Sequence, residues 1–176
     1  LCRGGADTFF LRSLDAPVEA APVPGWTVRL CQGASEVEPR ARAQYAAFGS
    51  SKTFEAYSAR FLRFMQSEVY ARALDLVAVD AAGQVGAFCI AWPDEATLRG
   101  HLEPVGTHPD FQRRGLGRAV LLEAMCLLQE GGMRSVSVLT PEDNAPAQAL
   151  YRSLGFQPAR RLSWYQKSLA AIPEGG

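Results

Sequence analysis

QRRGLG, residues 112–117, is the most informative stretch of this chain, because a predicted apolar helix begins where it ends. The strand-like segment 98–107 leads into it. Two glycines allow a tight turn and a close approach of the backbone to a ligand. The free N–H groups at the positive end of the following helix can bind a phosphate, and Arg113, Arg114 and Arg118 add positive charge. The stretch predicts a site for a phosphate or pyrophosphate, but such glycine loops also occur as plain tight turns.

Two better-known phosphate loops do not match this stretch. A Walker A loop needs a lysine after its second glycine, and no lysine follows Gly117. A dinucleotide fingerprint needs a third small residue where the chain has Val120, and it belongs in the first βα unit. This loop lies past the middle of the chain. The sequence therefore favours a phosphorylated cofactor that is neither ATP nor NAD.

A second motif follows the glycine loop and has the form N-x-x-A-x-x-L-Y-x-x-x-G-F. Its residues are Asn144, Ala147, Leu150, Tyr151, Gly155 and Phe156. Together the two motifs closely resemble those of the GNAT superfamily of acetyl-CoA-dependent N-acetyltransferases, and the resemblance runs over about 26–169. It implies an α/β fold, with a mixed, mostly antiparallel central sheet flanked by about four helices.

The resemblance also implies a binding site for acetyl-CoA as co-substrate, without a metal. The residues expected to contact acetyl-CoA are Val105, Gly106, Thr107, Gln112, Arg113, Arg114, Gly115, Leu116, Gly117, Arg118, Asn144, Ala147 and Tyr151. In the family the loop amides hold the pyrophosphate, while the Asn and the Tyr approach the pantetheine arm and the sulfur. Asn144 can equally be an ordinary helix N-cap, and the two roles are compatible. We assign Leu150 and Phe156 to the core.

Two residues are candidates for proton transfer. Glu103 lies on the strand where the family often places its general base, and it is the nearest carboxylate ahead of the loop. A solvated or arginine-paired Glu103, with water as the base, is the alternative. Tyr151 is the candidate acid for the CoA thiolate, and a buried structural tyrosine is its alternative.

The strand around Glu103 carries further expectations. Pro104 cannot donate to a sheet, so we expect the strands to bulge or separate there and to free the backbone of the next residues for pantetheine. An amide near Val105 is the expected donor to the oxyanion. His101 shares a strand face with Glu103 and is a candidate acceptor-site residue, whereas His108 is expected to be structural.

Bulk composition limits the function classes. The chain has 176 residues, 48% of them hydrophobic, which suits a single domain with one core. Its 18 basic and 18 acidic side chains cancel, so no nucleic-acid-binding surface is indicated. The cysteines lack metal-ligand spacing, and no apolar run suits a membrane span or a signal peptide. We expect a cytoplasmic enzyme that acts on a small-molecule amine.

The chain is predicted to alternate strands and helices. We expect strands at 26–31, 74–80, 85–92, 98–107, 134–140, 157–161 and 162–169. We expect helices at 36–48, with Ser35 as N-cap, and at 54–70, 116–130 and 145–154. Aromatic residues recur at helical spacing in 54–70. Most of them suit a core, but in the family the first two helices also wall the acceptor cleft.

The two ends of the chain resemble each other. Residues 8–14 match 163–169 in residue type at most positions, either by chance or because 8–14 is the last strand of a preceding, related domain. Segments 74–76, 88–92 and 103–109 look like the second domain of tandem GNAT proteins related to mycothiol synthase. We therefore assign 1–20 to a tail, with a strand and linker of a neighbour as one reading. Residues 25–170 form the GNAT domain, and 171–176 are a C-terminal tail.

A different class of function stays open at this point. The chain can be a catalytically silent domain that binds acetyl-CoA, or a structural half of a tandem protein. The intact glycine loop and the Asn/Tyr motif argue against both. Its partners are expected to be a second copy or a preceding GNAT domain.

Overall fold

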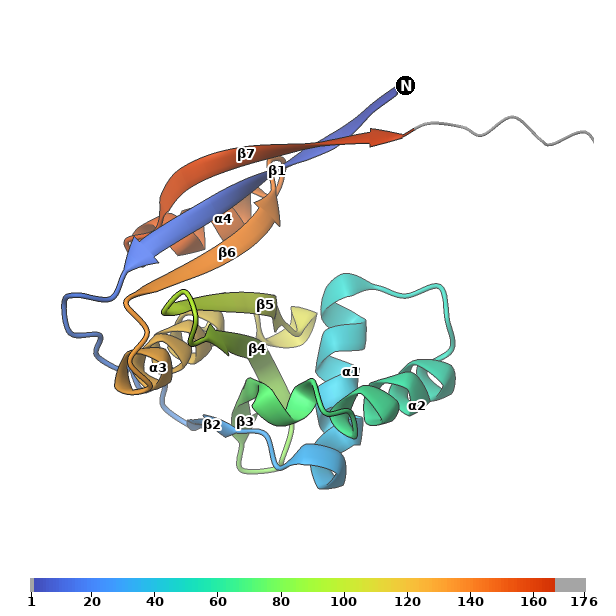
Figure 1. The fold of residues 1–176 in the computed structure, drawn as a ribbon. Helices are drawn as coiled ribbons and strands as arrows, with labels where there is room; N and C mark the ends of the chain where they lie inside the picture. Colours follow the sequence, from blue (N-terminus) through green and yellow to red (C-terminus); the bar gives the residue numbers. More distant parts are fainter. Residues whose placement is uncertain (1, 167–176) are drawn as a thin grey trace, which may run out of the picture.

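The computed structural model describes residues 2–166 and confirms the predicted α/β class (Figure 1). The strands are β1 (Cys2–Ser13), β2 (Trp26–Leu30), β3 (Leu74–Asp80), β4 (Val85–Asp94), β5 (Arg99–Thr107), β6 (Ser135–Pro141) and β7 (Gln157–Gln166). The helices are α1 (Val37–Phe48), α2 (Phe54–Met65), α3 (Leu116–Glu130) and α4 (Ala145–Ser153), with short 3₁₀ turns η1 (Gly33–Glu36), η2 (Tyr70–Arg72) and η3 (Pro109–Phe111).

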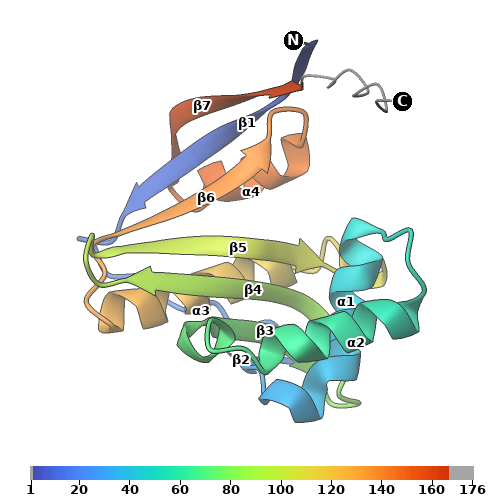
Figure 2. The ribbon, with the colours of Figure 1, turned by 45° about the vertical axis from the view of Figure 1, so that its right-hand side comes forward.

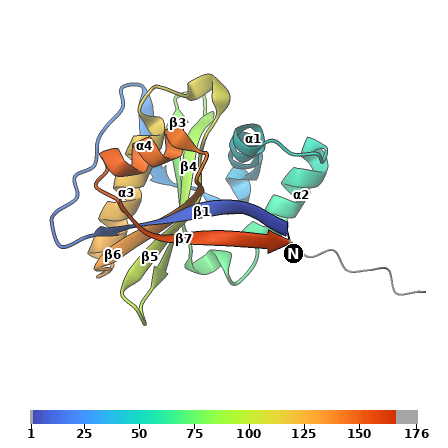
Figure 3. The ribbon, with the colours of Figure 1, turned by 90° about the horizontal axis from the view of Figure 1, so that it is seen from above.

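All the strands of the described chain form one sheet, in the order β2-β3-β4-β5-β6-β1-β7. Only β5 and β6 run parallel, so the sheet is mostly antiparallel, as predicted. Helices α1 and α2 lie on one side of the sheet and α3 and α4 on the other (Figure 3). The main core is packed between the sheet and α3 and α4; it includes Leu102 of β5, Met125 of α3 and Tyr151 of α4.

The sheet opens between β5 and β6. These strands pair only from Arg99 to Leu102, opposite Ser135–Val138, and then separate (Figure 2). On the other edge of β5, the register with β4 shifts, so that Glu103 and Pro104 lie opposite one residue of β4. The expected bulge at Pro104 is therefore present, and it comes where β5 and β6 diverge.

The N-terminal segment is a strand inside this sheet. β1 is paired with β6 on one side and with β7 on the other. Phe10 is fully buried and Leu14 nearly so, both in the main core. The sheet therefore extends beyond the boundary we predicted at residue 25, and 8–14 contributes to the packing of this domain.

Three local predictions need correction: the last two strands, the N-cap at Ser35 and the helix at 54–70. Strands 157–161 and 162–169 are one continuous strand as far as Gln166, because no turn separates them and β1 pairs along their length. Residues 167–169 and the predicted tail 171–176 lie outside the described part of the chain. Ser35 is not a helix cap: its hydroxyl donates to Gln32 within η1, and α1 begins at Val37.

The predicted helix at 54–70 ends early, at Met65. The Ser67 hydroxyl donates to the carbonyl of Phe64 at 2.7 Å and so takes an acceptor from the end of the helix. Thr53 caps the start of α2, where its side chain accepts from Ala56. Within residues 2–166, no helix is both long and apolar enough to cross a membrane.

Candidate active site

The glycine loop and the start of α3 form a surface of unpaired amides. Gly115 is the N-cap, with φ +82°, and has no side chain to cap the helix. Arg113 also has a positive φ, 63°. The first bond into the helix runs from the amide of Ala119 to Gly115, at 3.0 Å. The amides of 116–118 therefore have no acceptor within the helix and lie at its positive end.

A cavity of about 520 Å³ lies in front of these amides. It is lined by Ala47, Phe48, Val105, Gly106, Thr107, Gln112, Arg113, Gly115, Leu116, Gly117, Arg118, Asn144, Pro146, Ala147, Leu150 and Tyr151. Every residue predicted to bind the cofactor lines it, except Arg114. The Arg114 guanidinium instead donates to the carbonyl of Asp110 at 3.1 Å and lies over the ring of Phe111.

The prediction missed four lining residues. Leu150, which we assigned to the core, packs against the core and also lines the cavity. Pro146 follows Asn144 in the first turn of α4, so its place next to the motif was a usable signal. Ala47 and Phe48 come from the end of α1, far away in sequence. No local pattern marks them, because only the packing of α1 against the sheet brings them to the loop.

Asn144 and Tyr151 project from α4 to the same cavity. The side-chain oxygen of Asn144 accepts from the amide of Ala147 at 3.2 Å, so Asn144 is an N-cap. Its side-chain NH₂ is left to donate into the cavity. Tyr151 is nearly buried, and burial raises the pKa of its phenol well above the ordinary value. Its hydroxyl has no hydrogen-bond partner in the described part of the chain.

Glu103 is held in a small polar network at the point where the sheet opens. His101 lies between Ser137 and Glu103, with Nδ1 at 3.0 Å from the Ser137 hydroxyl and Nε2 at 3.2 Å from a Glu103 carboxylate oxygen. The Ser137 hydroxyl also donates to the carbonyl of Gly100 at 3.2 Å, so Nδ1 is the atom that donates to Ser137. Nε2 faces the Glu103 carboxylate, so His101 links Glu103 to Ser137 of the neighbouring strand β6.

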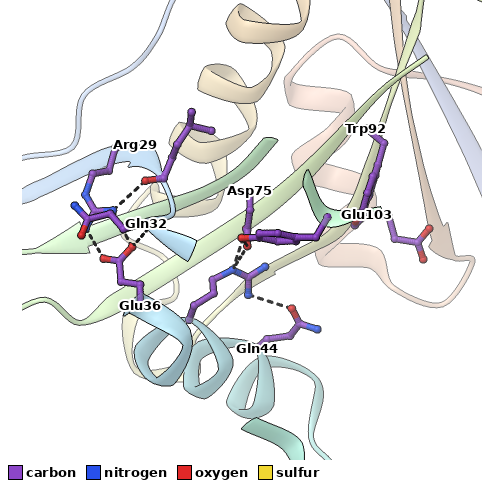
Figure 4. Close-up of polar contacts among 10 residues, drawn as sticks. Arg29, Gln32, Glu36, Gln44, Asp75, Trp92 and Glu103 are labelled. Carbon is purple, nitrogen blue, oxygen red and sulfur yellow. Dashed lines mark hydrogen bonds and ion pairs between the residues drawn. The ribbon is translucent and has the colours of Figure 1, made fainter. Parts of the chain in front are cut away.

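Trp92 supports the same bend in β5. Its indole N–H donates to the backbone carbonyl of Glu103 at 2.6 Å, and Figure 4 shows the Glu103 side chain extending past Trp92 and away from Asp75. The sequence prediction did not include Trp92. Trp92 lies on β4, which pairs with β5. The order of the strands in the chain suggests this pairing but does not give its register, so the sequence does not show which residue of β4 contacts Glu103.

A second cavity, of about 410 Å³, lies on the α1 and α2 side of the sheet. It is lined by Gln44, Tyr57, Arg60, Phe61, Phe64, Ile90 and Pro104. Three aromatic residues of the predicted stripe therefore line a cavity rather than only filling the core. Pro104 lines this cavity and the next residue, Val105, lines the first one, so consecutive residues of β5 contribute to the two cavities. Glu103 lines neither cavity and lies next to Pro104.

A buried ion pair forms the wall behind the second cavity. Arg40 and Asp75 are almost fully buried, with Nε at 2.9 and 3.1 Å from the two carboxylate oxygens. Arg40 also donates to the Gln44 side chain at 3.0 Å, and Asp75 and Gln44 lie at opposite ends of this contact chain (Figure 4). The guanidinium is 4.2 Å from the centre of the Phe88 ring and 5.1 Å from that of Phe61. The pair fixes the position of α1 against β3.

Burial disfavours the reactive thiolate form of Cys31, Cys89 and Cys126 by raising the pKa of each thiol. Burial raises the pKa of Cys31 to about 11, and Cys89 is fully buried. No group of three or more His, Cys, Asp or Glu residues that could hold a metal occurs between residues 2 and 166.

The structure is a mixed α/β domain with a cavity at its glycine loop, and comparison with known proteins gives the family. The model of the acetyltransferase (GNAT) family matches residues 41–156. The chain belongs to the GNAT family, whose acyl donor is acetyl-CoA. The predicted family and fold are therefore confirmed. The roles of the individual site residues remain predictions.

Relatives and solved structures show how far the similarity extends. Mycothiol acetyltransferase of Beutenbergia cavernae is 32% identical over 149 residues, covering 82% of this chain and 50% of that protein. The ribosomal protein bS18-alanine N-acetyltransferase of Escherichia coli is 40% identical over 86 residues, covering 47% of this chain and 55% of that protein. A GCN5-related N-acetyltransferase from Sphaerobacter thermophilus superposes with a TM-score of 0.76 at 25% identity, over 92% of this chain and 51% of the other. The chain thus spans half or less of the mycothiol acetyltransferases it matches.

Proposed function

We propose that the chain transfers an acetyl group from acetyl-CoA to the primary amine of a small molecule, by direct attack in a ternary complex. The observation that carries this proposal is that consecutive residues of β5, Pro104 and Val105, line two different cavities. One cavity combines unpaired amides with arginines and suits a pyrophosphate, and the other is lined by aromatic residues and suits an acceptor. Of the two candidate proton-transfer residues, Tyr151 lines the first cavity and Glu103 precedes Pro104 in β5.

Acetyl-CoA fits the first cavity through groups that the chain leaves free. The pyrophosphate would accept hydrogen bonds from the amides of 116–118, and Arg113 and Arg118 would balance its charge. The pantetheine arm would pair with the edge of β5 after Leu102, where β6 no longer supplies a partner. The side-chain NH₂ of Asn144 would donate to one of its amide carbonyls.

The chemistry then needs three proton transfers, shared by two residues. The acceptor ammonium loses one proton to Glu103, directly or through one water, and the neutral amine attacks the thioester carbonyl. The new C–N bond forms, the carbonyl electrons move to oxygen, and the amide of Val105 donates to that oxyanion. When the intermediate collapses, the C=O bond re-forms, the C–S bond breaks and Tyr151 gives its proton to the leaving thiolate. The nitrogen then loses its second proton to the tyrosinate, directly or through water, which leaves a neutral amide and restores Tyr151. A raised pKa keeps Tyr151 protonated at neutral pH, as an acid requires.

The second cavity supports a small acceptor. Its volume of about 410 Å³ matches a compact molecule, and its aromatic walls with Arg60 at the lining suit a polar molecule with flat or sugar-like faces. Of the relatives, one is named for mycothiol and another for an alanine of a ribosomal protein. We favour the small molecule, since the volume of about 410 Å³ and the aromatic lining from α2 suit a compact acceptor.

We also propose that the chain works beside a second GNAT domain. It spans about half of the longer relatives. A second copy of this chain is the alternative partner. A catalytically silent, structural domain is the alternative function.

The test is a binding assay followed by a transfer assay on the same protein. Acetyl-CoA at 100 times its Kd adds about 2.7 kcal/mol of stability, which a thermal shift detects. Transfer is then screened with aminoglycosides, amino-acid amides, a peptide with N-terminal alanine, and the mycothiol precursor that carries a free cysteinyl amine. Binding with turnover of a small amine supports the proposal. Binding without turnover of any amine supports the silent domain, and no shift at millimolar acetyl-CoA contradicts the cofactor assignment.

A further inference from the structure

A third cavity, of about 500 Å³, lies at the junction of β1, the segment that follows it, α3 and the end of α4. Two arginines from distant parts of the chain line it, Arg12 of β1 and Arg118 of the first turn of α3. Ser153 and Glu19 line it as well. The proposed reaction uses nothing in this cavity except Arg118, which it shares with the cofactor cavity.

Both arginines are held in place by neutral groups. The Arg12 guanidinium donates to the carbonyl of Leu154 at 2.7 Å and contacts the sulfur of Met125 at 3.4 Å. Arg118 reaches the carbonyl and the hydroxyl of Ser153, both at 3.4 Å. Neither arginine forms an ion pair with a carboxylate of the described chain. Glu19 lines the same cavity but is not paired with either of them.

Two like charges on one cavity repel each other. Burial and then the charge of Arg118 lower the pKa of Arg12. An anion between them would relieve this repulsion and accept charge-assisted hydrogen bonds from both guanidinium groups. The cavity is therefore built for a phosphate or a similar anion.

The position of the cavity indicates which anion would bind there. Arg118 lines both this cavity and the one that faces the α3 amides, so the two sites share a wall. Coenzyme A carries its pyrophosphate on the 5′ oxygen of a ribose and a separate phosphate on the 3′ oxygen of the same ribose. With the pyrophosphate on the amides of α3, the 3′-phosphate would be one sugar ring away, and the cavity that shares Arg118 is the neighbouring place for it.

We propose that Arg12 and Arg118 form a subsite for the 3′-phosphate of coenzyme A, an inference that rests on the proposed cofactor site. The subsite makes the chain select coenzyme A over its 3′-dephospho form. It also gives β1 a role in cofactor binding, since Arg12 lies outside both sequence motifs and reaches the cofactor only because β1 is inserted beside β6.

The experiment compares coenzyme A with 3′-dephospho-coenzyme A, by calorimetry on the whole chain. The wild type should bind coenzyme A about 10–100-fold more tightly, the range for charge-assisted bonds to one phosphate. Arg12→Gln should lose most of this preference while its affinity for the dephospho form stays unchanged, and Arg12→Lys should keep part of it. Arg134→Gln, an exposed arginine at the other end of α3, is the matched control and should keep the full preference.

Each outcome addresses one claim. If neither ligand binds, the proposed cofactor site is wrong. If both bind equally to the wild type, the cofactor site stands and the 3′-phosphate subsite is refuted, whatever the variants do. If the preference survives in Arg12→Gln, Arg12 has no part in it. A melting curve of Arg12→Gln with dephospho ligand shows whether the loss of the bond to Leu154 has disturbed the fold, and the wild-type comparison needs no variant.

Discussion

Replacing Phe10 by alanine tests whether β1 belongs to this domain. Phe10 is fully buried in the middle of β1, with its ring centre 6.0 Å from that of Tyr151 and 5.3 Å from the Arg152 guanidinium. A buried Phe→Ala change costs about 3–5 kcal/mol, because apolar contacts are lost and a cavity remains. In a protein of this size each kcal/mol lowers the Tm by about 2–4 °C, so we expect a drop of roughly 6–20 °C.

Urea unfolding followed by circular dichroism measures the free energy, and calorimetry measures the Tm. The matched control is Tyr165→Ala, an exposed aromatic on the neighbouring strand β7, which should cost less than about 0.5 kcal/mol. An unchanged slope of the urea transition would show that both variants unfold from the same folded state. If Phe10→Ala lost no more stability than the control, β1 would not pack in this core, and the insertion of β1 beside β6 would be refuted.

Four further substitutions, the last also combined with a second change, test the site and its support. Gly117→Val should lower acetyl-CoA affinity at least about tenfold in calorimetry, because its Cβ would lie only 3.0 Å from a side chain of β5 in the cofactor cavity; unchanged affinity would contradict the site. Glu103→Gln should lower kcat about 10²–10⁴-fold near neutral pH and recover as pH rises, since the amine, with a pKa of about 8–10, then loses its proton unaided. Tyr151→Phe should lower kcat without that recovery. If both variants showed the pH–rate profile of the wild type, neither Glu103 nor Tyr151 would transfer a proton in the reaction. Arg40→Leu should cost about 3–5 kcal/mol in urea unfolding by leaving Asp75 charged and buried, and a second change, Asp75→Leu, should restore much of it; a single variant as stable as the double one would show that the ion pair does not matter.

The local motifs could be predicted because their structure depends on adjacent residues. Gly115 and Gly117 permit the turn that precedes α3, and Asn144 caps α4, whatever the rest of the chain does. The bulge at Pro104 also follows from one residue, which lacks an N–H for the ladder. These two motifs and the end of β5 supply most of the residues that line the first cavity.

The contacts that complete the site depend on residues far apart in the chain. Nothing near Phe48 marks it as a cavity residue, and nothing near His101 indicates that Ser137 will orient it. Both contacts arise from the packing of α1 on the sheet and from the short parallel pairing of β5 with β6. Hydrophobic periodicity shows which face of a helix or strand is buried, but it does not show which other element packs against that face.

The sequence by itself determined the family, the α/β class, the glycine loop and the Asn/Tyr motif, because each is written in closely spaced residues with a local physical effect. Only the tertiary structure decided where β1 goes. The resemblance of 8–14 to 163–169 indicated a sheet-forming segment but could not say whose sheet it joins, since strand pairing joins residues distant in the chain. Inserted between β6 and β7, β1 brings Phe10 into the core and Arg12 beside Arg118.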